Sequence, residues 1–373
     1  MKRVICVILV MCFLVFPIKS NALSVSAKAA ILINGDTGEI LFEKNANSTL
    51  PMASTTKIMT ALLLCEHGDL EREITVSAEM LRVEGTSMGL LPGDKVTLRG
   101  LLYGMLLASG NDAANVTAYT LGQTIDGFVK MMNDKADELG LENTNFETPS
   151  GLDGEEHYTT AKDLAKLAKF ALGNKDFSMA AASKSAVLEY GNPPYKRTIT
   201  NHNKLLKIYD GAVGVKTGFT KKSGRCLVSA AKRDGKFVIA VTLNDPNDWE
   251  DHKNLLNYGL DIIKVTEITP ENINYEIPII SSKENLNVTV APFKTSYVNE
   301  QDFSCEVNLP KFLYAPIKKG EIIGSVVYYK GEEKICKLGL KAEKEILFIS
   351  QEFTFFDRFK ENFIGIFKNI WES

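Results

Sequence analysis

Hydrophobic and polar residues follow different patterns along the chain, and each pattern predicts a different arrangement of helices and strands. Apolar runs at 30–33 and 39–42 flank a turn with two glycines, which predicts an N-terminal β-hairpin. From about residue 54 to 172, apolar positions recur at helical spacing. Strands are expected again at 213–218 and 226–243, followed by a helix at 249–263. Early and late strands around a helical insert predict one sheet built from both ends of a single domain.

Strand-like alternation dominates the last third of the chain, from about residue 268 to 349. It is clearest at 286–290 and in a hairpin around Lys330 and Gly331. This region contains no motif that would support chemistry, so we interpret it as a spacer or docking domain. The expected fold class is therefore α/β (α+β): a large domain over residues 23–265 with an antiparallel sheet and a helical insert, then a small all-β domain over residues 268–349.

The two ends of the chain predict that the protein is exported and that it binds a membrane surface. Lys2 and Arg3 precede an apolar run and small residues follow it, so residues 1–22 are predicted to be a signal peptide. A membrane-spanning anchor, the alternative, needs about 20 apolar residues, more than this run offers. Residues 351–373 predict an amphipathic helix with a Phe-rich face that lies on a membrane; the alternative is a helix packed on its own protein. Together the ends predict a peripheral protein at the outer face of the cytoplasmic membrane.

Composition excludes several classes of partner. The net charge of −3 argues against a nucleic-acid partner. The four histidines are scattered and no glycine-rich phosphate loop occurs, so no metal and no cofactor are expected. Cys65 and Cys226 are expected to be buried apolar residues, whereas the pairing of Cys305 with Cys336 is left open.

Three short motifs with reactive side chains occur in a fixed order: Ser-Thr-Thr-Lys at 54–57, Ser-Gly-Asn at 109–111 and Lys-Thr-Gly at 216–218. Residues 52–67 predict a helix with Ser54 as its N-cap, and helical residues three apart share a face. The Lys57 amine is therefore expected to reach the Ser54 hydroxyl. A second Ser-x-x-Lys run, from Ser229 to Lys232, lies in a predicted hairpin, where residues three apart face opposite sides.

A serine hydroxyl is a weak nucleophile until a base removes its proton, and this requirement suggests roles for the other motif residues. Lys57 can be that base if burial and a neighbouring cation, here Lys216, lower its pKa. Ser109 is expected to relay a proton towards the leaving group, and Asn111 to orient Lys57 and hold a substrate carbonyl. On its own, the second motif would be interpreted as an ordinary loop and the third as the end of a strand. Their joint order favours a catalytic site.

The third motif indicates how a substrate would bind. Gly218 has no side chain, so an extended peptide can approach the predicted strand and pair with its backbone. Lys216 and the Thr217 hydroxyl form a receptor for an anionic end, such as a free carboxylate. The backbone N–H groups of Ser54 and of Phe219, just past the strand, are the candidates for an oxyanion hole.

These motifs together are the signature of penicillin-binding proteins and class A β-lactamases. The longer segments 51–60, 107–114, 157–161 and 211–218 resemble the low-molecular-mass serine-type D-alanyl-D-alanine carboxypeptidases, and the resemblance extends over about residues 26–350. It implies a β-lactamase/transpeptidase-like domain and a Ser54 acyl-enzyme. It also implies removal of the terminal D-alanine from peptidoglycan stem peptides and covalent trapping by β-lactam antibiotics.

Two positions depart from the pattern of the family. Many relatives have a histidine where this chain has Ser150, and Phe219 occupies a variable position where it supplies only its N–H and an apolar wall. His202 either lines the cleft or lies in a solvated loop.

Other functions share parts of this pattern. A class A β-lactamase needs a glutamate-activated water; Glu155 and Glu156 lie in a suggestive region, although their surroundings do not resemble that loop. A non-enzymatic cell-wall scaffold would have no reason to keep all the motif residues. Carboxypeptidase, endopeptidase and transpeptidase activities differ in whether water or an amine reaches the acyl-enzyme, which the sequence leaves open.

Overall fold

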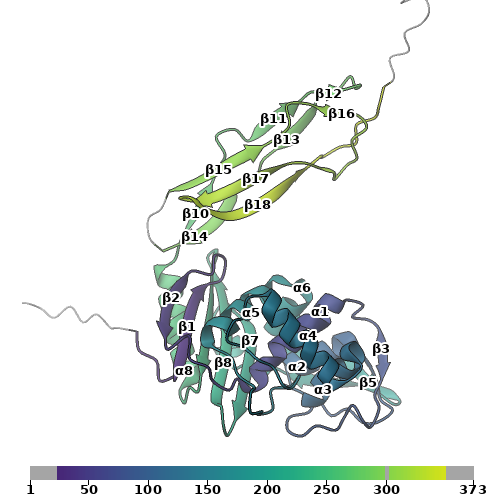
Figure 1. Cartoon of the computed structure of the whole chain (residues 1–373), viewed down its shortest axis with the longest axis vertical. Coiled ribbons are helices and arrows are strands. Elements are labelled where there is room, and N and C mark those ends of the chain that lie inside the picture. The colour runs from purple at the N-terminus through teal and green to yellow at the C-terminus, as the bar shows by residue number, and fades with distance from the viewer. Residues whose placement is uncertain (1–22, 299–301, 350–373) are drawn as a thin grey trace, which may run out of the picture.

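The structure, a computed structural model, describes residues 23–298 and 302–349, which form two folded parts (Figure 1). The predicted signal peptide at 1–22 and the aromatic segment at 351–373 lie outside these residues. Within the described part of the chain, no helix is long and apolar enough to cross a membrane. The first part ends with α8 (Asp248–Ile262), and the second begins with β10 (Lys264–Ile268).

A five-stranded antiparallel sheet forms the centre of the first part, in the order β2-β1-β9-β8-β7. Strands from the two ends of the domain therefore share one sheet, as the sequence pattern predicts. β7 is an edge strand, so one side of its backbone is not covered by another strand of the sheet. The strands are β1 (Ala29–Asn34), β2 (Ile40–Lys44), β7 (Ala212–Thr220), β8 (Gly224–Arg233) and β9 (Lys236–Leu243).

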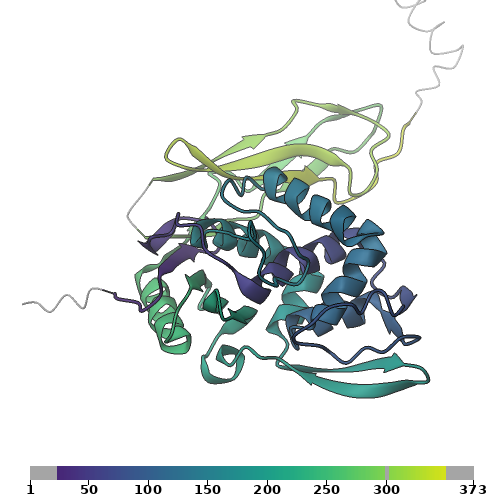
Figure 2. The same ribbon diagram turned by 60° about the horizontal axis from the view of Figure 1, so that its bottom comes forward.

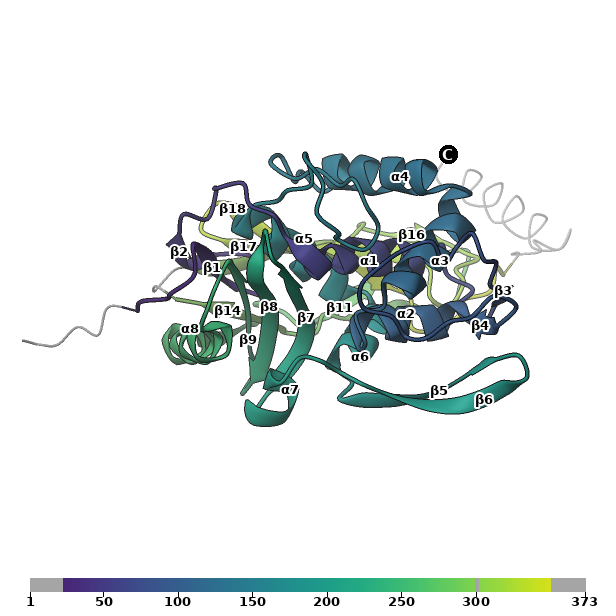
Figure 3. The ribbon, with the colours of Figure 1, turned by 90° about the horizontal axis from the view of Figure 1, so that it is seen from below.

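Both faces of this sheet are buried, which gives the domain three layers (Figure 3). Along β9, Val238 and Ala240 pack in the cluster that contains α8, whereas Ile239 and Val241 pack in the cluster that contains α5 (Ala161–Gly173). Successive strand residues point to opposite faces, so an unbroken apolar strand is suited to a sheet covered on both sides.

The helical insert surrounds α1 (Lys57–His67). Every residue of this helix from Lys57 to Cys65 is buried, so it is the central helix of the domain rather than an amphipathic surface helix. Its neighbours are the 3-10 helix η1 (Ala53–Thr56) and the helices α2 (Leu98–Leu106), α3 (Asn111–Gly122), α4 (Ile125–Glu138) and α6 (Lys175–Ala182).

The expected start of the helix at 52–67 is wrong. Residues Ala53–Thr56 form η1, the α-helix begins only at Lys57, and Ser54 is not an N-cap. Ala53 has a φ of +47°, which L-amino acids rarely adopt, and it is almost fully buried. Tertiary packing around Ala53 therefore decides the shape of this turn, and local helix signals do not report that packing.

A second sheet was not predicted from the sequence. It has the order β3-β4-β5-β6, and β5 and β6 form a long hairpin that projects beside the helices (Figure 2). Most side chains of this hairpin are at least partly exposed, so it lacks the apolar alternation that strand prediction needs. The strands are β3 (Glu73–Thr75), β4 (Lys95–Thr97), β5 (Ser185–Gly191) and β6 (Pro194–Thr200).

The second folded part is all-β, as predicted, with its own core around Leu286, Val288 and Tyr328. Cys305 and Cys336 are free; both lie opposite Tyr328, on the strands either side of β17, so that strand separates them. After β10 the strands are β11 (Asn274–Ile277), β12 (Ile279–Ile280), β13 (Leu286–Thr289), β14 (Phe293–Tyr297), β15 (Phe303–Asn308), β16 (Leu313–Tyr314), β17 (Ile322–Lys330) and β18 (Glu333–Lys341).

Candidate active site

All eight candidate site residues, seven from the three motifs together with Phe219, lie between η1, the start of α3 and the edge strand β7. Five of them line one cavity of about 340 Å³: Ser54, Ser109, Thr217, Gly218 and Phe219. The other three, Lys57, Asn111 and Lys216, are buried behind this cavity and bonded to its residues or to one another. Tertiary folding thus brings together three motifs that are spread over residues 54–218.

The Lys57 amine is fully buried and has three oxygen partners. Its Nζ lies 2.9 Å from Ser54 Oγ, 2.7 Å from Asn111 Oδ1 and 2.6 Å from the carbonyl oxygen of Ser150. Burial lowers the pKa of Lys57 well below its usual value; the nearby Lys216 lowers it further, and Asp112 acts in the opposite direction. A buried ammonium is unfavourable, so this environment favours the neutral amine.

Asn111 and Asp112 tie the loop at 84–90 to the start of α3. The Asn111 amide donates from Nδ2 to the Glu84 carbonyl at 2.6 Å, while its Oδ1 faces Lys57. The Asp112 carboxylate accepts hydrogen bonds from the backbone N–H groups of Met88 and Leu90, at 2.9 and 3.1 Å. These bonds orient the amide beside Lys57 and hold a loop that forms one wall of the cavity.

Lys216 and Ser109 form the second buried pair. Lys216 Nζ lies 3.0 Å from Ser109 Oγ and 2.8 Å from the carbonyl oxygen of Thr217. Burial lowers the pKa of Lys216 to about 7, so near neutral pH it exists in both protonation states. An anion bound beside it would favour the protonated form.

The strand that contains the third motif is longer than predicted. β7 continues to Thr220, so Phe219 lies within the strand and not just past it, because β7 keeps pairing with β8 up to Thr220 opposite Gly224. A Cβ atom on Gly218 would lie 3.0 Å from the Met52 carbonyl oxygen and 3.2 Å from Ser54 N. A side chain at position 218 would therefore press against the turn that carries Ser54.

Further residues line the cavity that no motif indicated. Arg225 binds both carboxylate oxygens of Asp248 at 2.8 Å and lies 5.5 Å from the ring centre of Trp249. His202 also lines the cavity, which decides between the two alternatives for this residue. Arg225 and His202 lie far from Asp248 and Trp249 in the sequence and meet them only in the folded chain. No motif spacing therefore predicts that these residues share a cavity. The remaining lining residues are Thr86 and Lys204.

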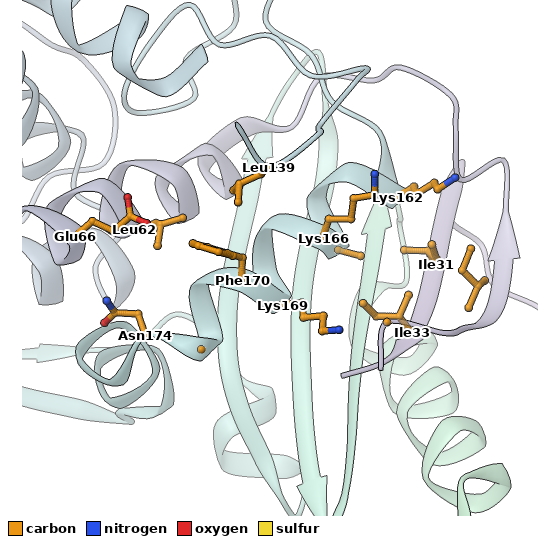
Figure 4. A pocket seen from close by; sticks show the side chains of 14 residues that line it. Ile31, Ile33, Leu62, Glu66, Leu139, Lys162, Lys166, Lys169, Phe170 and Asn174 are labelled. Atoms are coloured by element: carbon orange, nitrogen blue, oxygen red, sulfur yellow. The ribbon is translucent and has the colours of Figure 1, made fainter. Parts of the chain in front are cut away.

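A larger cavity of about 760 Å³ lies elsewhere, between α5, α1 and β1 (Figure 4). Ile31, Leu62 and Phe170 give it apolar walls, and α5 contributes Lys166 and Lys169. None of the eight candidate site residues lines it. The smaller cavity at Ser54 is thus the candidate active site, because there a serine hydroxyl lies next to a buried amine.

Neither a metal site nor a glutamate base is found at this cavity. The described residues contain no group of three His, Cys, Asp or Glu side chains that could hold a metal ion. Glu155 and Glu156 are exposed and do not line the cavity, so no observation favours a glutamate-activated water. At Ser150, where the sequence departs from the family pattern, the carbonyl binds Lys57, and the hydroxyl is buried without a hydrogen-bond partner among the described residues.

Comparison with known proteins identifies the family. The model of the D-alanyl-D-alanine carboxypeptidase family matches residues 17–247, and that of the penicillin-binding protein 5 C-terminal domain matches residues 276–347. The chain therefore belongs to the D-alanyl-D-alanine carboxypeptidase family, the serine carboxypeptidases among the low-molecular-mass penicillin-binding proteins. The family resemblance drawn from the motifs is thereby confirmed.

Some relatives extend over most of this chain, and others over about two thirds of it. The D-alanyl-D-alanine carboxypeptidase DacF of Bacillus subtilis is 31% identical over 342 residues, which is 88% of each chain. The crystal structure of the carboxypeptidase DacD from Francisella tularensis matches with a TM-score of 0.63 and 27% identity, over 87% of this chain and 94% of that one. The Streptomyces K15 DD-transpeptidase matches with a TM-score of 0.61 and 33% identity, over 64% of this chain and 98% of its own.

The close approach of β7 to η1 leads to a first prediction. Gly218→Ala places a Cβ against Met52 O and Ser54 N, so β7 must move away from the Ser54 turn. We expect acylation by a fluorescent penicillin to slow about ten- to a hundred-fold, because small misplacements of reacting groups have large effects on rate. The measurement is the acylation rate constant, with thermal unfolding as a check on folding.

Gly173→Ala is the matched control. A Cβ at Gly173 meets no atom within 4 Å, and Ala is favoured over Gly in a helix. This variant should acylate at the wild-type rate. Equal rates for both alanine variants would show that the contact at Gly218 does not shape the site.

Proposed function

We propose that this protein is a serine-type D-alanyl-D-alanine carboxypeptidase that removes the terminal D-alanine from peptidoglycan stem pentapeptides through a Ser54 acyl-enzyme. The observation that supports this most directly is the 2.9 Å contact between Ser54 Oγ and the fully buried amine of Lys57. It pairs a weak nucleophile with a base whose pKa is lowered, which is the requirement for serine catalysis without histidine.

Hydrogen-bond directions support Lys57 as the base. A neutral amine has two hydrogens and one lone pair. The Oδ1 atom of Asn111 and the carbonyl of Ser150 can only accept, so they take the two hydrogens of Lys57. The lone pair is left facing the Ser54 hydroxyl, which then donates its proton to Nζ.

The acylation step follows from this arrangement. Ser54 Oγ bonds to the carbonyl carbon of the penultimate D-alanine as its proton passes to Lys57. The C–N bond to the terminal D-alanine then breaks, and the leaving amine takes a proton through Lys57, with the hydroxyl of Ser109 as the relay. Water attacks the ester in the second half-reaction, releases the shortened peptide and returns the proton to Ser54. In a β-lactam the broken C–N bond lies in a ring, so the leaving amine stays attached to the acyl-enzyme.

The edge strand β7 is the proposed binding surface for the substrate. An extended stem peptide would add to β7 beside Gly218, and Lys216 with the Thr217 hydroxyl would hold its terminal carboxylate. The N–H groups of Ser54 and Phe219 would bind the developing oxyanion. Ser54 lies in the first turn of η1, where backbone N–H groups lack helical acceptors.

Carboxypeptidase activity is preferred over transfer or internal cleavage because relatives that cover most of both chains, B. subtilis DacF among them, are named carboxypeptidases. The names of other relatives differ: the Streptomyces sp. K15 protein is named both carboxypeptidase and DD-transpeptidase, and a Pseudomonas aeruginosa relative, 28% identical, is named an endopeptidase. Incubation with a pentapeptide ending in D-Ala-D-Ala, followed by mass spectrometry, separates these reactions. Loss of one alanine without a transfer product is expected.

We also propose the arrangement of the whole chain. Residues 1–22 would direct export, residues 23–265 would form the catalytic domain, and residues 268–349 would act as a spacer. Residues 351–373 would bind the outer surface of the cytoplasmic membrane through their aromatic face. Relatives that act on the cell wall support a site of action outside the cytoplasm.

Ser54 is predicted to be the acylated residue. Labelled penicillin should attach covalently to the protein, and peptide mapping should find the adduct on Ser54. Ser54→Ala should abolish labelling. Ser229→Ala should retain it, because β8 holds Ser229 Oγ 2.5 Å from His252, away from any lysine partner. Labelling that survives in Ser54→Ala would disprove the assignment.

The two buried lysines are predicted to respond differently to substitution. Lys57→Met removes the base while keeping the volume, so acylation should fall by about 10²–10⁴. Lys216→Arg keeps the positive charge next to Ser109 and should retain part of the activity, although Arg is not an equivalent donor. Acylation rates of both variants test this difference. Equal and mild effects would contradict the roles proposed for the two residues.

The C-terminal segment is predicted to hold the mature protein at the membrane. Basic and acidic residues nearly balance in this segment, so binding should depend on apolar burial rather than on charge. High salt should therefore release little protein, whereas detergent should release it. Truncation before Phe353 should give a soluble protein that still binds penicillin. A truncated protein that stays on membranes would place the anchor elsewhere.

A further inference from the structure

One peptide group at the active site, formed by the Ala53 carbonyl and the Ser54 N–H, is held by a line of hydrogen bonds. Thr56 Oγ1 lies 2.8 Å from the Ala53 carbonyl oxygen and 2.8 Å from His157 Nε2. His157 Nδ1 accepts a hydrogen bond from the backbone N–H of Glu147 at 2.9 Å. Thr56 and His157 are both buried, so water does not compete for these bonds.

The chemistry of the partners gives this line a direction. The backbone nitrogen of Glu147 can only donate, so His157 Nδ1 is an acceptor and the neutral ring carries its proton on Nε2. Nε2–H then donates to Thr56 Oγ1, and the single hydroxyl hydrogen of Thr56 goes to the Ala53 carbonyl. Each hydrogen bond is therefore donated in the same direction, from Glu147 through His157 and Thr56 to the Ala53 carbonyl. Rotating either side chain would leave a buried polar group unpaired.

The neutral ring is the form of His157 present at pH 7. Burial lowers the pKa of His157 to about 4; Lys222 acts in the same direction and Asp153 in the opposite one. Since this pKa lies below the usual value, the neutral ring persists until the pH falls towards 4. The edge-on contact with Phe146, at 6.0 Å between ring centres, also holds the ring in place.

Steric contacts act on the same carbonyl. A Cβ atom on Gly151 would lie only 2.0 Å from Ala53 O, so the backbone at Gly151 packs directly against this carbonyl. Ala53 itself has a φ of +47°, a strained conformation that persists only where its surroundings hold it. In a planar trans peptide the C=O and N–H bonds point in opposite directions. Fixing the Ala53 carbonyl therefore fixes the direction of the Ser54 N–H.

We propose that Thr56 and His157 are positioning residues, which hold the Ala53 carbonyl so that the Ser54 N–H points to where the oxyanion develops. This inference rests on the proposed function, since it takes Ser54 as the nucleophile and its own N–H as an oxyanion donor. Neither side chain lines the cavity, so both act through the peptide in front of them. A preoriented donor stabilises developing charge without reorganisation, which is why its orientation affects rate more than binding.

Thr56→Val tests the proposal, with Thr55→Val as a matched control. Both variants remove a buried hydroxyl from η1, but the Thr55 hydroxyl donates to the Met52 carbonyl at 2.6 Å and not to Ala53. Stopped-flow kinetics with a fluorescent penicillin separate the acylation rate constant from the dissociation constant of the complex that precedes it. Thr56→Val should lower the rate constant about ten- to a hundred-fold and leave that dissociation constant unchanged. Thr55→Val should stay within about three-fold of wild type.

An aryl boronic acid gives a second measure of the same donor. Its boron bonds to Ser54 Oγ, the serine proton passes to Lys57, and one boron-bound oxygen occupies the oxyanion position. Thr56→Val should weaken this inhibitor by a factor similar to its loss in acylation rate. His157→Gln, which keeps an N–H donor, should retain most of the activity, whereas His157→Leu should resemble Thr56→Val. NMR of the ring nitrogens should find the neutral Nε2–H form of His157 at pH 7.

Three results would overturn the proposal: wild-type acylation by folded Thr56→Val, an equal loss in Thr55→Val, or a loss confined to the non-covalent complex. Thermal unfolding of each variant confirms that it is folded. A wild-type protein that is not acylated at Ser54 would instead refute the proposed function. The two failures are therefore distinguishable.

Discussion

The removal of the Lys57 amine from water is the constraint on which the rest of the site depends. Lys57 and Lys216 are among the largest fully buried side chains in the described structure. A buried ammonium is strongly disfavoured unless it is paired, so the fold must either provide a counter-charge or lower the pKa. Here the contacts of Lys57 with Asn111, Ser54 and Ser150 are to neutral oxygens. The low pKa of Lys57 is thus a direct consequence of how deeply α1 is buried.

The three-layer domain supplies the rigidity that this burial requires. α1 is buried inside the helical layer, and β7 forms the edge of a sheet that is covered on both faces. Packing around them therefore holds these two elements in place relative to each other. β7 also packs tightly against the turn before α1, where a Cβ atom on Gly218 would lie 3.0 Å from the Met52 carbonyl oxygen. The proposed nucleophile, Ser54, therefore lies in a tight turn between a buried helix and the edge strand β7. Reactive side chains next to an unpaired strand edge would suit the proposed hydrolysis of an extended peptide.

Much of the fold was predictable because its strands and helices are apolar in regular patterns. The hairpin of β1 and β2, the shared sheet and the all-β second part all follow from periodicity. The hairpin of β5 and β6 was missed because most of its side chains are not buried, so they show little alternation. The helix start was misplaced because contacts from distant segments, and not a capping side chain, hold Ala53 in its unusual conformation.

The sequence by itself determined which residues are chemically able to react. Spacing put Ser54 and Lys57 on one side of a turn, and excluded Ser229 because it lies in a strand. Only the tertiary structure decided how those residues behave. The pKa of Lys57, the neutral state of His157 and the place of Arg225 in the cavity depend on segments far apart in the chain. Local spacing specifies which neighbours a side chain can reach, whereas desolvation and orientation are properties of the whole packed interior.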